Sequence, residues 1–190
     1  GVLKLENKHL VIDSEGNGIV LSRNCEIVIE DAQGREKSRH HVPYGTKILA
    51  AEGSKVKKGQ KVAEWDPFTI PVISEKAGQA ELVDLINNVS VKETVDETTG
   101  IVSKVVVDWR SNSSSAGLKP SIMLKDAKGK PVTYDNGKEV RYYLSVDAIL
   151  TVDNGAEVKV GDVIARIPRE SSKTKDITGG LPRVAELFEA

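Results

Sequence analysis

In residues 1–42 apolar and polar positions alternate, which is the pattern of half-buried β-strands. Between Cys25 and Ile29, positions 25, 27 and 29 share one face, and Asp31–Gly34 supplies a turn directly afterwards. No segment before about residue 170 has helical periodicity over the length of a helix, although Ala80–Ile86 is compatible with a strand or a single helical turn. The pattern predicts an all-β fold.

The closing segment departs from this alternation and spaces its apolar residues as a helix does. Pro182 suits a first helical turn, and Gly179–Gly180 in front of it gives the chain a pivot. A helix this short falls below the roughly 12–15 residues needed for marginal stability in water, so we expect it to lack stability on its own. The pattern stops at Ala190 without a capping residue, which suggests a piece of a longer protein. The stripe consists of Leu181, Val184, Ala185 and Phe188.

A glycine pattern occurs twice, at an offset of 102 residues (155 − 53). A turn sequence also recurs: Glu30–Gly34 matches Lys125–Gly129 at an offset of 95 (125 − 30). Because this offset is shorter than 102, the second copy contains extra residues between the turn and the glycine pattern, and we place them in Tyr134–Glu139. Two copies of one small β module are the economical interpretation. The pattern reads Gly53-x-x-Val56-x-x-Gly59-x-x-Val62-Ala63 in the first copy and Gly155-x-x-Val158-x-x-Gly161-x-x-Ile164-Ala165 in the second.

The polar, turn-prone segment Glu93–Gly100 is the predicted boundary between the modules. The sequence therefore divides into a first module at 1–95, a second at 96–170 and a mobile arm at 171–190. Ser111–Gly117 is expected to be a surface loop inside the second module.

Composition excludes several classes of protein. A net charge of −1 gives no global attraction to nucleic acid or membrane. A single cysteine excludes an internal disulfide and a multi-cysteine zinc site, in agreement with a reducing cytoplasm. No apolar run approaches about 18 residues and no signal-peptide layout is present, so we expect a soluble intracellular chain without membrane contact.

Few residues suggest chemistry. The cluster Lys55, Lys57, Lys58 and Lys61 is more often plain surface, with contact to a DNA backbone as the alternative. No nucleophile–base arrangement, phosphate-binding loop or catalytic carboxylate pair is present, so the chain is not a self-contained enzyme. The remaining candidates have structural interpretations: a solvated strand end for His40–His41, a buried thiol for Cys25, a solvated turn for Glu93, Asp96 and Glu97, and core positions for Trp65 and Trp109.

The glycine pattern resembles the sandwich-barrel hybrid module and the related biotinyl and lipoyl carrier domains. Carriers have a lysine in a tight hairpin shortly after the pattern. Here those positions are Glu64–Phe68 and Arg166–Arg169, which contain no lysine, and Lys76 lies too far downstream. A carrier pair remains the alternative function.

The run Lys173–Ala190 resembles the C-terminal arm of the trigger loop in the largest (β′) subunit of bacterial RNA polymerases. The rest resembles the insertion within that loop, made of two sandwich-barrel hybrid modules, through Val42–Gly45, Trp65–Pro67 and Ile164–Glu170. The resemblance implies two tandem barrel-like all-β modules with a short C-terminal helix. It assigns the hinge and start of the arm to Thr178, Gly179, Gly180, Leu181, Pro182 and Arg183.

In this family the trigger loop closes over the incoming nucleoside triphosphate and reopens for translocation. The resemblance implies a non-catalytic insertion that modulates loop movement, nucleotide addition and pausing. It transfers no catalytic residue, because the family's substrate-contacting residues lie on the other arm of the loop. The enzyme would be the parent DNA-directed RNA polymerase, with Mg²⁺ and structural Zn²⁺ bound elsewhere and no cofactor in this segment. Implied partners are the rest of β′, the β, α, ω and σ subunits and downstream DNA, in the cytoplasm at the nucleoid.

Overall fold

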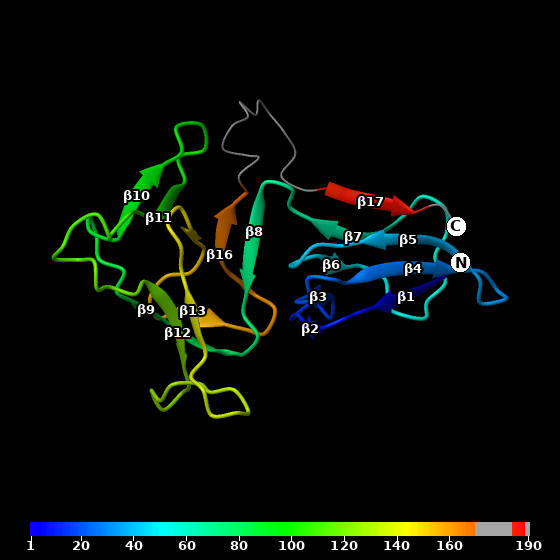
Figure 1. Ribbon diagram of the computed structural model, residues 1–190, viewed down its shortest axis with the longest axis horizontal. Helices are drawn as coiled ribbons and strands as arrows, with labels where there is room; N and C mark the ends of the chain where they lie inside the picture. The colour runs from blue at the N-terminus through cyan, green and yellow to red at the C-terminus, as the bar shows by residue number, and fades with distance from the viewer. Residues whose placement is uncertain (170–183, 189–190) are drawn as a thin grey trace. The chain divides into compact units, whose positions relative to one another are not determined.

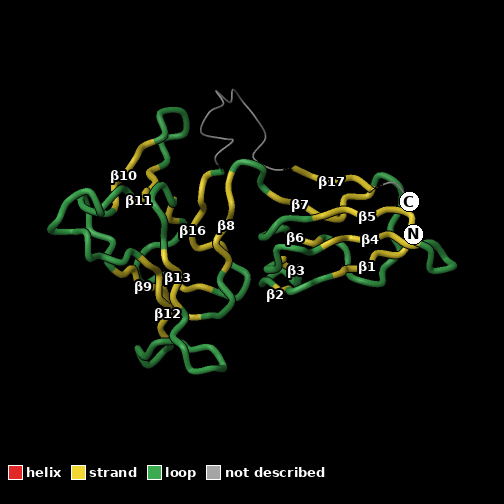
Figure 2. The backbone as a smooth tube through the Cα atoms, in the orientation of Figure 1, coloured by secondary structure: helices red, strands yellow, loops and turns green. Residues whose placement is uncertain are grey.

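The computed structural model describes residues 1–169 and 184–188, and every regular element in them is a β-strand (Figure 1 and Figure 2). The predicted all-β class is confirmed. The chain divides into two compact units: unit 1 contains Gly1–Ile70 and the chain from Arg169 onward, and unit 2 contains Pro71–Pro168. The chain therefore leaves unit 1, completes unit 2 and returns to unit 1.

Unit 1 has two sheets around one core. Leu3 and Leu5 of the first strand are buried while Lys4 between them is exposed, as the alternation requires. Ile27 and Val62, one from each sheet, belong to the same core cluster. The sheets have the orders β1 (Val2–Glu6), β4 (Glu26–Glu30), β5 (Glu36–His41) and β17 (Val184–Phe188), β7 (Gln60–Trp65), β6 (Lys47–Ile48), β3 (Gly18–Val20), β2 (Leu10–Ile12).

Unit 2 is built in the same way. Ile122 and Ile164, one from each sheet, are both 0% exposed and share a core cluster with Trp109. The segment Ala80–Ile86, ambiguous in the sequence, contributes mainly to a strand, β9 (Gly78–Val83). The sheets have the orders β13 (Arg141–Tyr143), β12 (Ser121–Lys125), β9 (Gly78–Val83), β15 (Glu157–Val158) and β10 (Val91–Val95), β11 (Val102–Val106), β14 (Ile149–Leu150), β16 (Val163–Pro168), β8 (Thr69–Ile73).

The two units share one topology. In unit 2, β9, β10, β11, β12, β14 and β16 take the positions of β1, β2, β3, β4, β6 and β7 in unit 1. Even the outermost strand of the five-stranded sheet has a counterpart, because β8 lies beside β16 as β17 lies beside β7. The duplication inferred from the glycine pattern therefore extends to the arrangement of both sheets.

The glycine pattern occupies equivalent turns in the two units. Gly53 and Gly155 have φ values of 84° and 87°, a region that side chains with a Cβ rarely adopt. The alanines that end the pattern, Ala63 and Ala165, are 0% exposed and pair with Ile48 and Leu150 of the neighbouring strand. The pattern thus specifies a turn and a close strand contact, as the sequence indicated.

The structure places the boundary between the units at Ile70/Pro71 rather than at the predicted 95/96. Glu93–Gly100 is the tip of the hairpin β10–β11 inside unit 2, with Val95 opposite Val102. The strand β9, assigned to the first module by the sequence, pairs with β12. Polar turn composition is the same for a hairpin tip and a linker, and only the long-range strand pairing distinguishes them.

The predicted C-terminal helix is not seen in its described part. Val184–Phe188 forms β17, antiparallel to β7, with Val184 opposite Trp65, Phe188 opposite Gln60 and an irregularity between Glu186 and Leu187. A helix of this length is marginal without a partner, whereas the edge of β7 offers backbone donors and acceptors to an added strand. Residues 181–183 and 189–190 lie outside the described residues.

We expect unit 1 to fold after excision of residues 71–168. The Arg169 N–H donates to the Phe68 carbonyl at 2.9 Å, so a short Gly-Ser linker can join Ile70 to Arg169 without disturbing unit 1. A cooperative thermal transition and dispersed amide spectra should remain. An excised chain that shows no cooperative transition would contradict the division.

Candidate nucleic-acid interface

The lysine cluster lies on the turn that leads into β7. The Gln60 N–H donates to the Lys57 carbonyl at 3.1 Å, and the Lys57 N–H donates to Gln60 Oε1 at 3.0 Å. Gly59 has φ of 80°, as a type II turn requires at its third position. Val56, 4% exposed, anchors the segment in the core. The backbone of this turn is thus fixed by its own hydrogen bonds.

All four lysines of the turn are exposed. Lys55 and Lys57 flank the buried Val56, and Lys61 precedes the buried Val62 at the start of β7. Among the described residues, no salt bridge involves Lys55, Lys57 or Lys61. The sequence prediction of one clustered cationic surface is consistent with this geometry, and the cations are held at the surface by a rigid turn.

The second copy shows that the fold does not require these lysines. Its turn has the same geometry: the Asp162 N–H donates to the Lys159 carbonyl at 3.1 Å, and Gly161 has φ of 89°. The positions equivalent to the four lysines hold Glu157, Lys159, Val160 and Val163. One backbone therefore carries four cations in unit 1 and a balanced pair of charges in unit 2, so the turn geometry does not depend on the lysines.

The pair His40–His41 lies on β5, with His41 opposite Glu26 and His40 opposite Ile27. Neighbouring residues of a strand point to opposite faces, so the two imidazoles do not converge on one ion. No group of three or more metal-ligating side chains occurs in the part of the chain that the structure describes.

Acidic side chains do gather around Arg39 on the solvent face of β1, β4 and β5. Its guanidinium donates to Glu36 at 3.0 and 3.1 Å, to Glu6 at 2.5 Å, and to Glu26. The hydrogen bonds that Arg39 donates lower the pKa of Glu36, and the carboxylates of Glu36, Glu6 and Glu26 that accept them raise the pKa of Arg39. The three carboxylates outnumber the single guanidinium, and the cluster ties three strands together.

The acidic residues at the tip of the β10–β11 hairpin form a turn, as the sequence predicted. The Asp96 carboxylate accepts N–H bonds from Thr98 and Thr99, which lower its pKa. Trp109 is 7% exposed and donates its indole N–H to the Leu118 carbonyl at 2.9 Å, and Trp65 packs against the core of unit 1. The predicted core position of Trp109 is confirmed, whereas Trp65 is partly buried.

Cys25 is buried in the core of unit 1, as predicted. Desolvation raises the pKa of its thiol, so the nucleophilic thiolate is disfavoured at neutral pH. We expect the folded chain to react with a disulfide reagent at least about tenfold more slowly than the chain in concentrated guanidinium chloride. Equal rates in the two conditions would contradict this burial.

The turn after β7 lacks the features of a carrier site. Asp66 accepts hydrogen bonds from the Phe68 N–H at 2.8 Å and from Thr69 Oγ1 at 2.6 Å, so a carboxylate organises this turn. Lys76 is half-buried between β8 and β9, and its carbonyl accepts from Ser74 Oγ at 2.7 Å. Neither position presents an exposed hairpin lysine.

The predicted hinge and start of the arm lie outside the described residues. This applies to Thr178, Gly179, Gly180, Leu181, Pro182 and Arg183, for which the structure gives no geometry.

A comparison with protein-family models finds no match to this chain. Among the described residues, there is no helix with the length and apolarity needed to span a membrane.

DNA binding tests directly whether the lysine turn is a nucleic-acid interface. Changing Lys55, Lys57 and Lys61 to Gln should weaken binding of the chain to a random-sequence duplex at low salt. The slope of log affinity against log salt concentration should fall by about 0.9 for each lysine that contacts a phosphate. The matched control changes Lys119, Lys128 and Lys130, three exposed lysines of unit 2, to Gln. Equal losses in both variants would assign the effect to net charge and contradict a localised interface.

Proposed function

We propose that this chain is part of the β′ subunit of a bacterial RNA polymerase, as a two-module insertion in the trigger loop followed by the start of its C-terminal arm. The observation that carries the proposal is the run Lys173–Ala190, whose resemblance to that arm is long and specific. The parent enzyme synthesises RNA from nucleoside triphosphates on a DNA template. The insertion contributes no catalytic group, and Mg²⁺ and Zn²⁺ belong to other parts of the enzyme.

The geometry of unit 1 suits an insertion within a loop. The Val56 N–H donates to the Gly1 carbonyl at 2.7 Å, and Phe188 pairs with Gln60 at the other side of the lysine turn. The first and last described residues therefore lie near the same end of β7 (Figure 1). Closely spaced ends allow a domain to be inserted into a host loop with little disturbance.

The strand β17 suggests how the insertion biases loop movement. Residues 184–188 pair with β7 here, whereas their apolar spacing fits the helix that the arm adopts in the family. One segment cannot occupy both conformations at once, so pairing with β7 competes with the helical arm. The insertion then favours the open loop by the free energy of this strand pairing.

The lysine turn gives the insertion a cationic surface for downstream DNA, the partner expected from the family position. The other expected partners are the rest of β′ and the β, α, ω and σ subunits, in the cytoplasm at the nucleoid.

The flanking coding sequence tests the assignment. We expect an apolar helix with a histidine before Gly1 and an aspartate-rich magnesium motif further upstream. Their absence would refute the assignment.

A pair of biotinyl or lipoyl carriers is the second candidate, supported by the duplicated glycine pattern. It predicts a mass increase at one lysine after co-expression with a biotin or lipoyl ligase. We expect an unmodified mass, because neither turn after the pattern contains a lysine.

A further inference from the structure

One seven-residue pattern occurs twice in unit 2, at an offset of 18 residues (151 − 133). It reads Thr-x-Asp-Asn-Gly-x-Glu, first at Thr133–Glu139 and again at Thr151–Glu157. In an Asn-Gly pair the glycine nitrogen can attack the asparagine side-chain amide, because glycine has no Cβ to obstruct the approach. The two copies contain the pairs Asn136-Gly137 and Asn154-Gly155, and a third pair is Asn17-Gly18. Since the reacting groups are the same, a difference in their reactivity comes from the fold.

The first copy forms an exposed turn. Residues 135–139 are all exposed. The Gly137 N–H donates to the Tyr134 carbonyl at 2.9 Å, and the Tyr134 N–H donates to the Lys138 carbonyl at 2.8 Å. Gly137 has φ of 85°, and the space where a Cβ would lie has no atom of a distant residue within 4 Å. The hydrogen bonds of this turn thus join residues of the turn itself, so its tip can open while both sheets of unit 2 stay intact.

The same turn activates the side-chain amide of Asn136. The Lys138 N–H donates to Asn136 Oδ1 at 3.0 Å. Attack on Asn136 Cγ places negative charge on this oxygen, and a backbone N–H aimed at the oxygen stabilises that charge. The attacking nitrogen belongs to the next residue, Gly137, so the reaction is intramolecular and needs only a rotation of the backbone.

The second copy is anchored to β9, which lies between β12 and β15. The Gly155 N–H donates to the Ala80 carbonyl at 2.7 Å, and Asn154 Oδ1 accepts the Leu82 N–H at 3.0 Å. Gln79 Nε2 also donates to the Gly155 carbonyl at 3.1 Å. Both reacting groups of this copy are therefore hydrogen-bonded to a strand of the sheet. The Gly155 nitrogen can reach Asn154 Cγ only after the turn has detached from β9.

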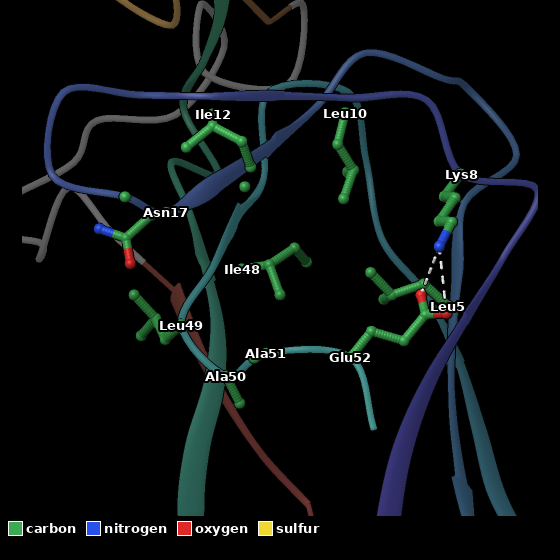
Figure 3. Close-up of a pocket in the computed structure, with 12 residues that line it drawn as sticks. Leu5, Lys8, Leu10, Ile12, Asn17, Ile48, Leu49, Ala50, Ala51 and Glu52 are labelled. Atoms are coloured by element: carbon green, nitrogen blue, oxygen red, sulfur yellow. Dashed lines mark hydrogen bonds and ion pairs between the residues drawn. The ribbon is translucent and has the colours of Figure 1, made fainter. Parts of the chain in front are cut away.

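The third pair is held by strand pairing in unit 1. Gly18 belongs to β3 and pairs with Ile12 of β2 and with Ile48 of β6. Asn17 donates its N–H to Asp13 Oδ1 at 2.9 Å, and its carbonyl accepts the Asp13 N–H at 2.9 Å. Asn17 and Gly18 line one hollow of unit 1 together with Ile12 and Ile48 (Figure 3). Rotation of the Gly18 nitrogen towards Asn17 Cγ would break the β3 pairing on both sides.

From these differences we infer that Asn136 is a site of spontaneous deamidation, whereas the fold protects Asn154 and Asn17. The Gly137 nitrogen bonds to Asn136 Cγ, and its proton leaves with the side-chain NH₂ as ammonia, so that a cyclic succinimide remains. Water then opens the ring at either carbonyl, which gives aspartate or isoaspartate at position 136. Both products carry a carboxylate in place of the amide, so the turn gains a negative charge. The reaction is independent of the proposed function, since water is its only co-reactant.

The test incubates the folded chain at mildly alkaline pH and follows each Asn-Gly peptide by mass spectrometry after digestion. Deamidation at Asn136 should be at least about tenfold faster than at Asn154 or Asn17, because reaction there requires detachment from a sheet. Two free peptides, acetyl-Thr-Tyr-Asp-Asn-Gly-Lys-Glu-amide and acetyl-Thr-Val-Asp-Asn-Gly-Ala-Glu-amide, provide the matched control and should react at similar rates. Equal rates at Asn136 and Asn154 in the folded chain, or a faster reaction at Asn154, would overturn the inference.

The variant Asn136→Gln tests the chemistry. Its side chain is longer by one methylene, which disfavours ring closure, and its exposed position leaves the core unchanged, so the thermal transition should stay the same. Isoaspartate is measured by methyl transfer from labelled S-adenosylmethionine with a protein isoaspartyl methyltransferase. The label should accumulate with incubation time in the original chain and at least about tenfold more slowly in the variant. Equal labelling of both chains, or a product at position 136 that is aspartate alone, would overturn the inference.

Discussion

Truncation of Ile27 to Ala should destabilise unit 1 by about 2–5 kcal/mol, and Ile122 to Ala should do the same to unit 2. The two isoleucines are equivalent in the repeat, at the offset of 95 (122 − 27), and both are 0% exposed. Each lies on the central strand of its three- or four-stranded sheet, in β4 and β12. Removal of the side chain leaves a cavity that the close-packed core cannot collapse completely.

The pair of variants also tests the division of the chain. Because Ile27 and Ile122 belong to different core clusters, each truncation should lower the thermal transition of one unit only. Hydrogen exchange measured for each backbone amide shows which unit has lost stability. Val95 to Ala serves as a surface control, since its side chain is 62% exposed, and it should change stability by less than about 0.5 kcal/mol. A single transition shifted equally by either core truncation would contradict two separate cores.

The sequence was sufficient for the fold class and for the duplication. Alternation around Cys25–Ile29 and the glycine pattern each depend on local chemistry: one buried face in a strand, and positive φ at a turn. The core positions of Cys25 and Trp109 follow from the same alternation.

The sequence-based predictions were wrong where pairing between strands distant in the sequence decides the local structure. Glu93–Gly100 has the composition of a linker but is a hairpin tip, because β10 finds its partner in β11. Val184–Phe188 has helical spacing but forms a strand, because the edge of β7 accepts it. The position of Gly18 beside Ile48 also required the strand register. At this position the two copies differ, glycine against Lys104, and the difference is visible only after the strands have been aligned.

The proposed role of the insertion depends on competition between β17 and a helical arm. Deletion of residues 1–168 from the parent polymerase removes β7 and leaves 184–188 free to become helical. Loop closure should then be favoured, so nucleotide addition should be faster and pauses shorter. We expect pause lifetime and addition rate each to change by about fivefold, which corresponds to the low end of the coupling free energies usual between two sites. Excision of residues 71–168 alone keeps β7 and serves as the matched control, with pausing close to that of the intact enzyme.

The most direct measurement is the pause lifetime and the single-nucleotide addition rate of the intact polymerase, the 71–168 excision and the 1–168 deletion on one template. The account predicts shorter pauses and faster addition for the 1–168 deletion, with the smaller excision close to the intact enzyme. Identical rates and lifetimes in all three enzymes would contradict a role for this insertion in trigger-loop movement.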